Sequence, residues 1–208
     1  MKSVNWLALL GLGVFVASDV FAQESYSPGA NTDHPTNVYW GDMHVHTSMS
    51  SDDANFMGDN DFSSTVAYEY ARGDLVTTRN GMNIRIRKPL DFLVIADHAE
   101  QLGVLASVQI GDPEILKFDA GKELQMRYKA HKANPSSQEL AQDFRGYMRE
   151  VGGQLGDAYD LSVWETVAAR ADEYNDPGTF TALIGYEWSS LGSVQGVFGN
   201  LHRVVVFK

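Results

Sequence analysis

The sequence contains no cysteine, which removes two kinds of structure from consideration. Without cysteine the chain cannot form a disulfide bond, even in an oxidising compartment, and it cannot offer a thiolate to a metal ion. Any metal site in this protein must therefore use histidine, aspartate, glutamate and water as its ligands. A lipid anchor attached through cysteine is excluded for the same reason.

Positive charge is also scarce. Lysine and arginine together number 16 against 27 aspartate and glutamate residues, so the formal net charge is −11 at pH 7. This acidic excess argues against nucleic acid as a general partner. An anionic small-molecule substrate is still compatible with it, because bound cations would be the strongest local charges in a metal site. We expect a small-molecule substrate, and the sequence does not predict an oligomeric state.

The N-terminal apolar run is too short to span a membrane comfortably. It covers 12 residues, 6–17, whereas a transmembrane helix needs about 20. The run follows Lys2 and precedes small residues ending at Ala22, which is the pattern of a secretory signal peptide. We predict a bacterial-type signal peptide over residues 1–22, cleaved near Ala22, and a secreted or periplasmic protein without membrane attachment. A membrane anchor is the alternative for this segment.

The composition of the whole chain, 44% hydrophobic and 21% charged, is that of a globular protein. Residues 23–36 are rich in serine, proline, asparagine and glycine and predict an extended lead-in. We expect residues 37–208 to form one α/β domain, with a helical insertion at residues 109–176. Two helices of this insertion are expected to begin at Ser136 and Ser162, because glutamate follows each serine three residues later.

Two local patterns predict elements before that insertion. Residues 64–72 predict a short helix with Val66, Ala67 and Tyr70 on its apolar face. Asn80-Gly81, flanked by alternating residues, predicts a β-hairpin.

The first strong strand signal places three polar side chains on one face. Residues 39–47 (YWGDMHVHT) predict a short buried strand, in which Asp42, His44 and His46 project to one side. Met43 is expected to point the other way and pack against covering helices. Two imidazoles on one face can bind a single divalent ion. For this motif alone, a pair of partly exposed loop histidines is the alternative.

Two further strands carry metal-binding groups near their ends. Residues 91–98 form an apolar run that ends in Asp97 and His98, as in a parallel strand buried on both faces. A third strand, predicted as one continuous element, carries Glu187 near its end. If it pairs with the following strand as a hairpin, His202 comes to the same edge of the sheet. A buried structural histidine is the alternative for His98.

These motifs together resemble the metal-ligand series of the PHP (polymerase and histidinol phosphatase) superfamily. The residues around them are similar to a secreted PHP-like family, domain of unknown function family 3604, over residues 37–208. The resemblance rests on four motifs in order, GDMHVHT, ADHAE, GYEW and NLHR, which begin at Gly41, Ala96, Gly185 and Asn200.

The resemblance implies the N-terminal portion of a distorted (β/α)7 PHP-type barrel with a helical insertion. Two or three divalent metal ions (Zn, Mn or Fe) would bind at the C-terminal ends of its strands. The implied metal ligands are His44, His46, His98, Glu187 and His202. His44 and His46 would share one ion, and Glu187 would bridge two. Asp42 and Asp97 would be the catalytic carboxylates, orienting the ligands, with weak ligation an alternative for Asp42.

The sequence departs from the PHP pattern towards its C-terminus. PHP barrels complete their metal cluster with a later Asp-x-His pair, and the C-terminal part of this sequence has no counterpart of that pair. A (β/α) barrel also usually needs about 250 residues. We therefore expect a truncated chain with an incomplete metal site and an exposed sheet edge.

The resemblance implies metal-dependent hydrolysis, with a phosphate ester as the favoured substrate and water as the nucleophile. The fragment itself would be inactive. One alternative is an amidohydrolase-type metal hydrolase, and another is a periplasmic metal- or carbohydrate-binding module without turnover.

Overall fold

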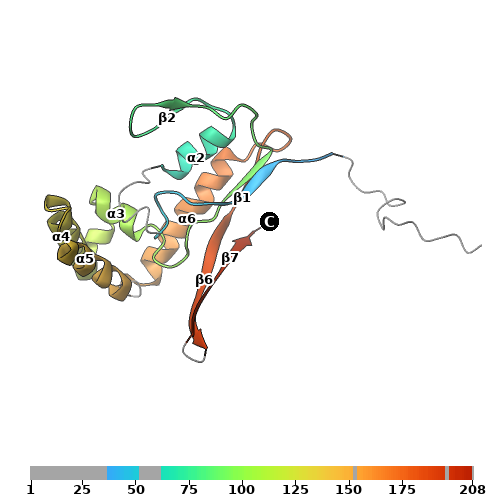
Figure 1. Cartoon of the computed structure of the whole chain (residues 1–208). Coiled ribbons are helices and arrows are strands. Elements are labelled where there is room, and N and C mark those ends of the chain that lie inside the picture. The colour runs from blue at the N-terminus through green and yellow to red at the C-terminus, as the bar shows by residue number, and fades with distance from the viewer. Residues whose placement is uncertain (1–36, 52–61, 152–153, 195–196, 208) are drawn as a thin grey trace, which may run out of the picture. The chain divides into compact units, whose positions relative to one another are not determined.

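The computed structural model describes residues 37–51, 62–151, 154–194 and 197–207. The chain divides into two compact units, Met1–Val38 and Tyr39–Lys208, and every described helix and strand lies in the second (Figure 1). The predicted signal peptide and lead-in lie outside the described residues. Among the helices that are described, none is long and apolar enough to cross a membrane.

A three-stranded parallel sheet forms the centre of the second unit. Its strands are β1 (Gly41–Val45), β4 (Phe92–Ile95) and β5 (Thr181–Leu183), in the order β1-β4-β5. The central strand β4 is buried from its second residue onward. Its apolar run has partners on both sides and cover on both faces, so the predicted buried parallel strand is confirmed.

The outer strand β1 differs from its prediction. We expected a buried strand, but its residues are exposed as far as His44, and Met43 retains 49% of its accessible surface. Among the described strands, β1 pairs only with β4 and is therefore an edge strand. Val45 packs against the apolar core, but the expected packing of Met43 against helices is wrong.

The strand predicted to carry Glu187 is broken into two. After β5 the chain passes Ile184 and continues as β6 (Gly185–Val194), which pairs antiparallel with β7 (Val197–Val206). This pairing confirms the predicted C-terminal hairpin (Figure 1). Gly185 allows the close approach where β6 begins, because a Cβ there would lie 2.6 Å from Val94 Cγ1 and 2.8 Å from the Val205 carbonyl oxygen.

The hairpin around Asn80-Gly81 is also confirmed, with β2 (Val76–Thr77) paired to β3 (Asn83–Ile84). The preceding helix α2 (Ser64–Ala71) begins where expected, and the Ser63 hydroxyl accepts a hydrogen bond from the Val66 amide. Its most buried residues are Tyr68 and Ala71, so the predicted apolar face is wrong in detail. That predicted face instead lines a cavity: Val66, Ala67 and Tyr70.

Helices occupy the chain between β4 and β5. They are α3 (Val104–Ile110), the 3₁₀ turn η1 (Ile115–Lys117), α4 (Asp119–Ala133), α5 (Gln138–Val151) and α6 (Asp157–Tyr174). One apolar core lies among these helices, and a second lies between α2, α6 and the sheet. Helix α6 joins the two cores, because Val163 belongs to the first and Ala171 to the second.

Both predicted helix starts in this region are displaced. Helix α5 begins at Gln138, and the Ser137 hydroxyl, rather than that of Ser136, accepts a hydrogen bond from the Leu140 amide. Helix α6 begins at Asp157, so Ser162 lies inside the helix. The helix extends further back because Tyr159 is buried in the core and donates a hydrogen bond to the Ser107 hydroxyl.

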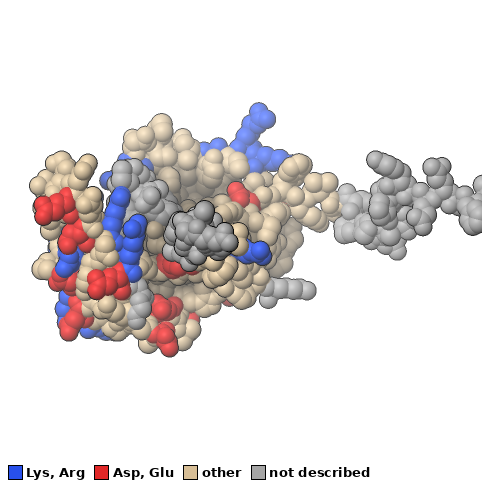
Figure 2. All heavy atoms as spheres, turned by 60° about the horizontal axis from the view of Figure 1, so that its bottom comes forward, with Lys and Arg blue, Asp and Glu red and all other residues tan. Residues whose placement is uncertain are grey.

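Charged side chains of both signs gather over α4 and α5 (Figure 2). Several form ion pairs within or between these helices, such as Arg127 with both Glu123 and Asp143. Exposed pairs of this kind add little to stability, so the apolar cores hold the helices together.

Leucine-to-alanine substitutions at a buried and an exposed position test this account. Leu124→Ala should lower the free energy of unfolding by about 2–5 kcal/mol, because Leu124 is fully buried in the helical core. Leu161→Ala is the matched control at a 56% exposed position and should change the free energy of unfolding by less than about 0.5 kcal/mol. Urea denaturation followed by circular dichroism measures both values. Equal losses at the two positions would contradict the assignment of the core.

Candidate metal centre

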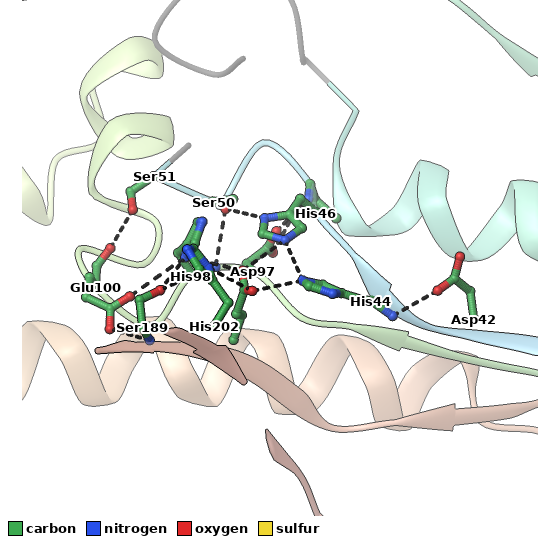
Figure 3. A network of polar contacts seen from close by, with 12 residues as sticks. Asp42, His44, His46, Ser50, Ser51, Asp97, His98, Glu100, Ser189 and His202 are labelled. Atoms are coloured by element: carbon green, nitrogen blue, oxygen red, sulfur yellow. Dashed lines mark hydrogen bonds and ion pairs between the residues drawn. The ribbon is translucent and has the colours of Figure 1, made fainter. Parts of the chain in front are cut away.

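Four separate segments bring histidine and glutamate side chains together beyond β4 (Figure 3). Two backbone hydrogen bonds set the position of Glu187 there. Its amide donates to the Asp97 carbonyl at 2.9 Å, and its carbonyl accepts from the Ala99 amide at 2.8 Å. The start of β6 thereby extends the sheet beyond β4 and places Glu187 beside His98.

The first group of possible ligands is His44, His46 and Glu187. The two Nε2 atoms lie 3.1 Å apart, and each lies 3.1 Å from one carboxylate oxygen of Glu187. Donor atoms around a tetrahedral zinc ion, with bonds of about 2.0–2.1 Å, are separated by about 3.3 Å. These three side chains are therefore spaced to bind one divalent cation.

The second group is His98, Glu187 and His202. The Nδ1 atom of His98 lies 3.3 Å from Glu187 Oε2, and that of His202 lies 2.9 Å from Oε1. Each oxygen of the Glu187 carboxylate thus faces one histidine of each group. The five residues predicted as metal ligands lie close together, and Glu187 belongs to both groups.

Glu187 is 2% exposed, so its charge needs compensation by neighbouring groups. Burial alone raises the pKa of this carboxyl. A hydrogen bond from His44 and the positive charges of His98, His44 and His202 outweigh burial, and the pKa lies below its ordinary value. A cation bound among these nitrogens would also compensate the Glu187 charge.

Asp97 is buried, at 3% exposure, but its carboxylate binds the turn that follows β1. One oxygen accepts a hydrogen bond from the Thr47 amide, and the other accepts one from the Thr47 hydroxyl at 2.7 Å. Burial, together with the charge of Asp97, also raises the pKa of the neighbouring Tyr68 hydroxyl. We predicted that Asp97 orients the ligands, and its contacts with Thr47 hold the turn directly after His46.

Asp42, the other predicted catalytic carboxylate, lies outside both ligand groups. Its side chain is exposed, points away from the cluster and accepts a hydrogen bond from the His44 amide at 2.9 Å (Figure 3). It therefore contacts the backbone of a ligand residue rather than the ring that would bind a cation.

Three polar residues that the sequence did not single out surround the cluster. The Ser50 hydroxyl contacts His46, and the Ser189 hydroxyl lies 3.1 Å from His98 Nδ1. Glu100 accepts a hydrogen bond from the Ser189 amide at 3.0 Å and brings its second oxygen to 3.8 Å from His98 Nδ1. A serine in a polar loop has no distinguishing pattern, but Glu100 lies within the ADHAE motif.

A cavity of about 520 Å³ adjoins the first ligand group. It lies between β1, helix α2 and the β2–β3 hairpin, and its lining is almost entirely apolar. Asp42, His46 and Tyr70 are the lining residues with an ionisable group. The cavity has the size and the mostly apolar lining of a site for the organic part of a small molecule.

The fold and this cluster define a mixed α/β protein with a candidate metal centre made of histidine and glutamate. A family model described as "Protein of unknown function (DUF3604)" matches residues 33–208. The chain therefore belongs to the DUF3604 family, as its four motifs predicted. Comparisons with curated proteins and with solved structures gave no match. Membership of the PHP superfamily stays a prediction.

Substitution of the shared carboxylate should remove metal binding from both ligand groups. For Glu187→Gln we expect zinc affinity to fall by more than about 100-fold, beyond the loss typical of residues that only support a ligand. Asp42→Asn is the matched acidic control and should bind zinc as the wild-type protein does. Isothermal titration of metal-free protein measures both. Wild-type affinity in Glu187→Gln would contradict the proposed position of the cations.

A second substitution separates the position of Asp97 from ligation. Asp97→Ala leaves the Thr47 amide and hydroxyl without this carboxylate and should lower the free energy of unfolding by about 1–3 kcal/mol. Urea denaturation in excess chelator measures this change in the absence of metal. Unchanged stability combined with lost zinc binding would instead make Asp97 a ligand.

Proposed function

We propose that this protein is a metal-dependent hydrolase that cleaves phosphate esters. The observation that supports the proposal most directly is the Glu187 carboxylate, whose two oxygens each face one histidine nitrogen from each of two ligand groups. Cations shared by one carboxylate can hold both the attacking and the leaving oxygen of a displacement reaction.

The residues present fit a pair of divalent cations, because two groups of nitrogen and oxygen donors have the spacing that such ions need. His44 and His46 would bind one ion, His98 and His202 the other, and Glu187 both. When bound, the ions would lower the pKa of a water molecule and stabilise negative charge on the phosphate oxygens.

The protein's own groups would position the substrate in this reaction. The Ser189 hydroxyl lies 3.1 Å from His98 Nδ1 and 3.4 Å from His202 Nδ1, where it can donate a hydrogen bond to a phosphate oxygen. Water adds to phosphorus while the ester P–O bond breaks, and the alcohol leaves with a proton. The products are inorganic phosphate and that alcohol.

The apolar cavity supports an ester with an apolar alcohol group. Its volume of about 520 Å³ suits a small organic group, and His46 lies at its edge. An aryl or branched alkyl group in this cavity would place the attached phosphate beside the first ligand group.

The sheet also supports a proposed relation to PHP-type barrels. Strands β1, β4 and β5 are parallel neighbours, as consecutive barrel strands are, and the ligand residues lie at the carboxyl side of β1 and β4. In (β/α) barrels this side carries the chemistry. The described strands form three small sheets, and none of these closes into a barrel, so the barrel stays a proposal.

Hydrolysis of phenyl phosphate tests the proposed activity. Purified protein that includes any coding sequence following Lys208 should release phosphate only when Mn²⁺ or Zn²⁺ is present. Chelation or His44→Ala should abolish turnover, because each removes the groups that activate water. Phosphate release is measured colorimetrically.

Two outcomes would contradict the proposal. Turnover that survives chelation would exclude a metal-dependent reaction. Zinc binding without hydrolysis of any ester or amide in a broad panel would favour a metal-binding module.

A further inference from the structure

We propose that Ser50 is a positioning residue that determines which nitrogen of His46 is available to a cation. The inference rests on the proposed metal centre but not on the reaction that the centre catalyses. Ser50 belongs to neither ligand group.

The Ser50 side chain is fixed between two of the ligand-bearing segments (Figure 3). Ser50 has no exposed surface, and its Oγ lies 2.8 Å from His46 Nδ1. The same oxygen accepts a hydrogen bond from the His98 amide at 3.2 Å. The Ser50 amide donates to the Thr47 carbonyl at 3.1 Å, which closes the turn and limits how far the hydroxyl can move.

The second nitrogen of His46 identifies the atom that would bind the cation. His46 Nε2 lies 3.1 Å from His44 Nε2 and 3.1 Å from Glu187 Oε2, whereas Nδ1 faces Ser50. A neutral imidazole has one N–H group and one lone pair. If Nε2 binds a cation, the proton must be on Nδ1, where it needs an acceptor.

The Ser50 hydroxyl meets this need without giving up its other contact. A hydroxyl oxygen has two lone pairs, so it can accept from the His98 amide and from His46 Nδ1–H at the same time. Hydrogen bonding at one ring nitrogen fixes the tautomer and orientation of a metal-binding histidine. One oxygen atom thereby connects His46 in the first ligand group to His98 in the second.

Zinc titration of Ser50 variants tests the proposal. Ser50→Ala removes the acceptor, and we expect zinc affinity to fall by about 10–100-fold. Ser50→Thr keeps a hydroxyl and should recover most of that affinity. Ser51→Ala is the matched control in the same loop, because the Ser51 hydroxyl donates to the Glu100 carbonyl, and it should bind zinc with wild-type affinity.

Nuclear magnetic resonance of the histidine ring nitrogens supplies a readout that general loosening of the loop would not move. In the zinc-loaded wild-type protein, His46 should carry its proton on Nδ1 and bind zinc through Nε2. In Ser50→Ala the Nδ1–H signal should broaden, because without the hydroxyl acceptor this proton would exchange with solvent more rapidly. This measurement on the wild-type protein stands even if Ser50→Ala does not fold.

Three results would overturn the proposal. They are wild-type zinc affinity in Ser50→Ala, zinc bound through Nδ1 of His46 in the wild-type protein, and absence of zinc binding by the wild-type protein. Zinc binding with the expected tautomer but without ester hydrolysis would leave the role of Ser50 standing and contradict only the proposed activity.

Discussion

Compensation of one buried negative charge is the constraint on which this structure depends. Glu187 is 2% exposed, and a carboxylate removed from water is strongly destabilising unless paired charges surround it. The surrounding partners are four histidine nitrogens within 2.9–3.3 Å, from His44, His46, His98 and His202. A divalent cation bound among these nitrogens would add positive charge directly beside the carboxylate. The free energy of cation binding would therefore add directly to the stability of the folded segments around Glu187.

The fold brings these side chains together through backbone pairing rather than through sequence proximity. Parallel strands β1 and β4 present their carboxyl ends at one edge of the sheet, which places His46 near His98. Gly185 then lets β6 pack closely on Val94 as the chain leaves β5. The hydrogen bonds between Glu187 and the backbone after β4 complete the arrangement, so the bonds that extend the sheet also build the site.

Much of the site was predictable because its residues combine an informative type with an informative position. Imidazole and carboxylate groups at the ends of apolar runs indicated ligands, and parallel pairing explains why distant runs meet. The break between β5 and β6 was missed, although Gly185 directly after Ile184 is the kind of residue that marks a bulge or a close backbone approach within a strand. The DUF3604 motifs located the ligands but carried no information on how the chain leaves the sheet.

The supporting residues were harder to predict for a physical reason. The sequence does not show whether a carboxylate next to a ligand histidine faces a cation or a turn of the backbone. In the structure the Asp97 carboxylate binds Thr47. Ser50 lies in a loop where serine is common and gains its importance only from a histidine ring and an amide that the fold brings to it. The exposure of β1 was not predicted, because the alternation of residues along one strand does not show how many other strands pair with it.

The exposure of β1 and the firm position of His46 are reconciled by the turn that follows the strand. Thr47 is bound by Asp97, Ser50 by the His98 amide, and the Met49 carbonyl by the Gly103 amide at 2.8 Å. All three contacts come from the segment that follows β4, between Asp97 and Gly103, so this segment, and not the exposed edge strand, holds the turn after His46. His44 precedes this turn and its side chain is 49% exposed, against 24% for His46. The first ligand group therefore combines one firmly held imidazole with one that can adjust, and a cation would order His44 more than His46 on binding.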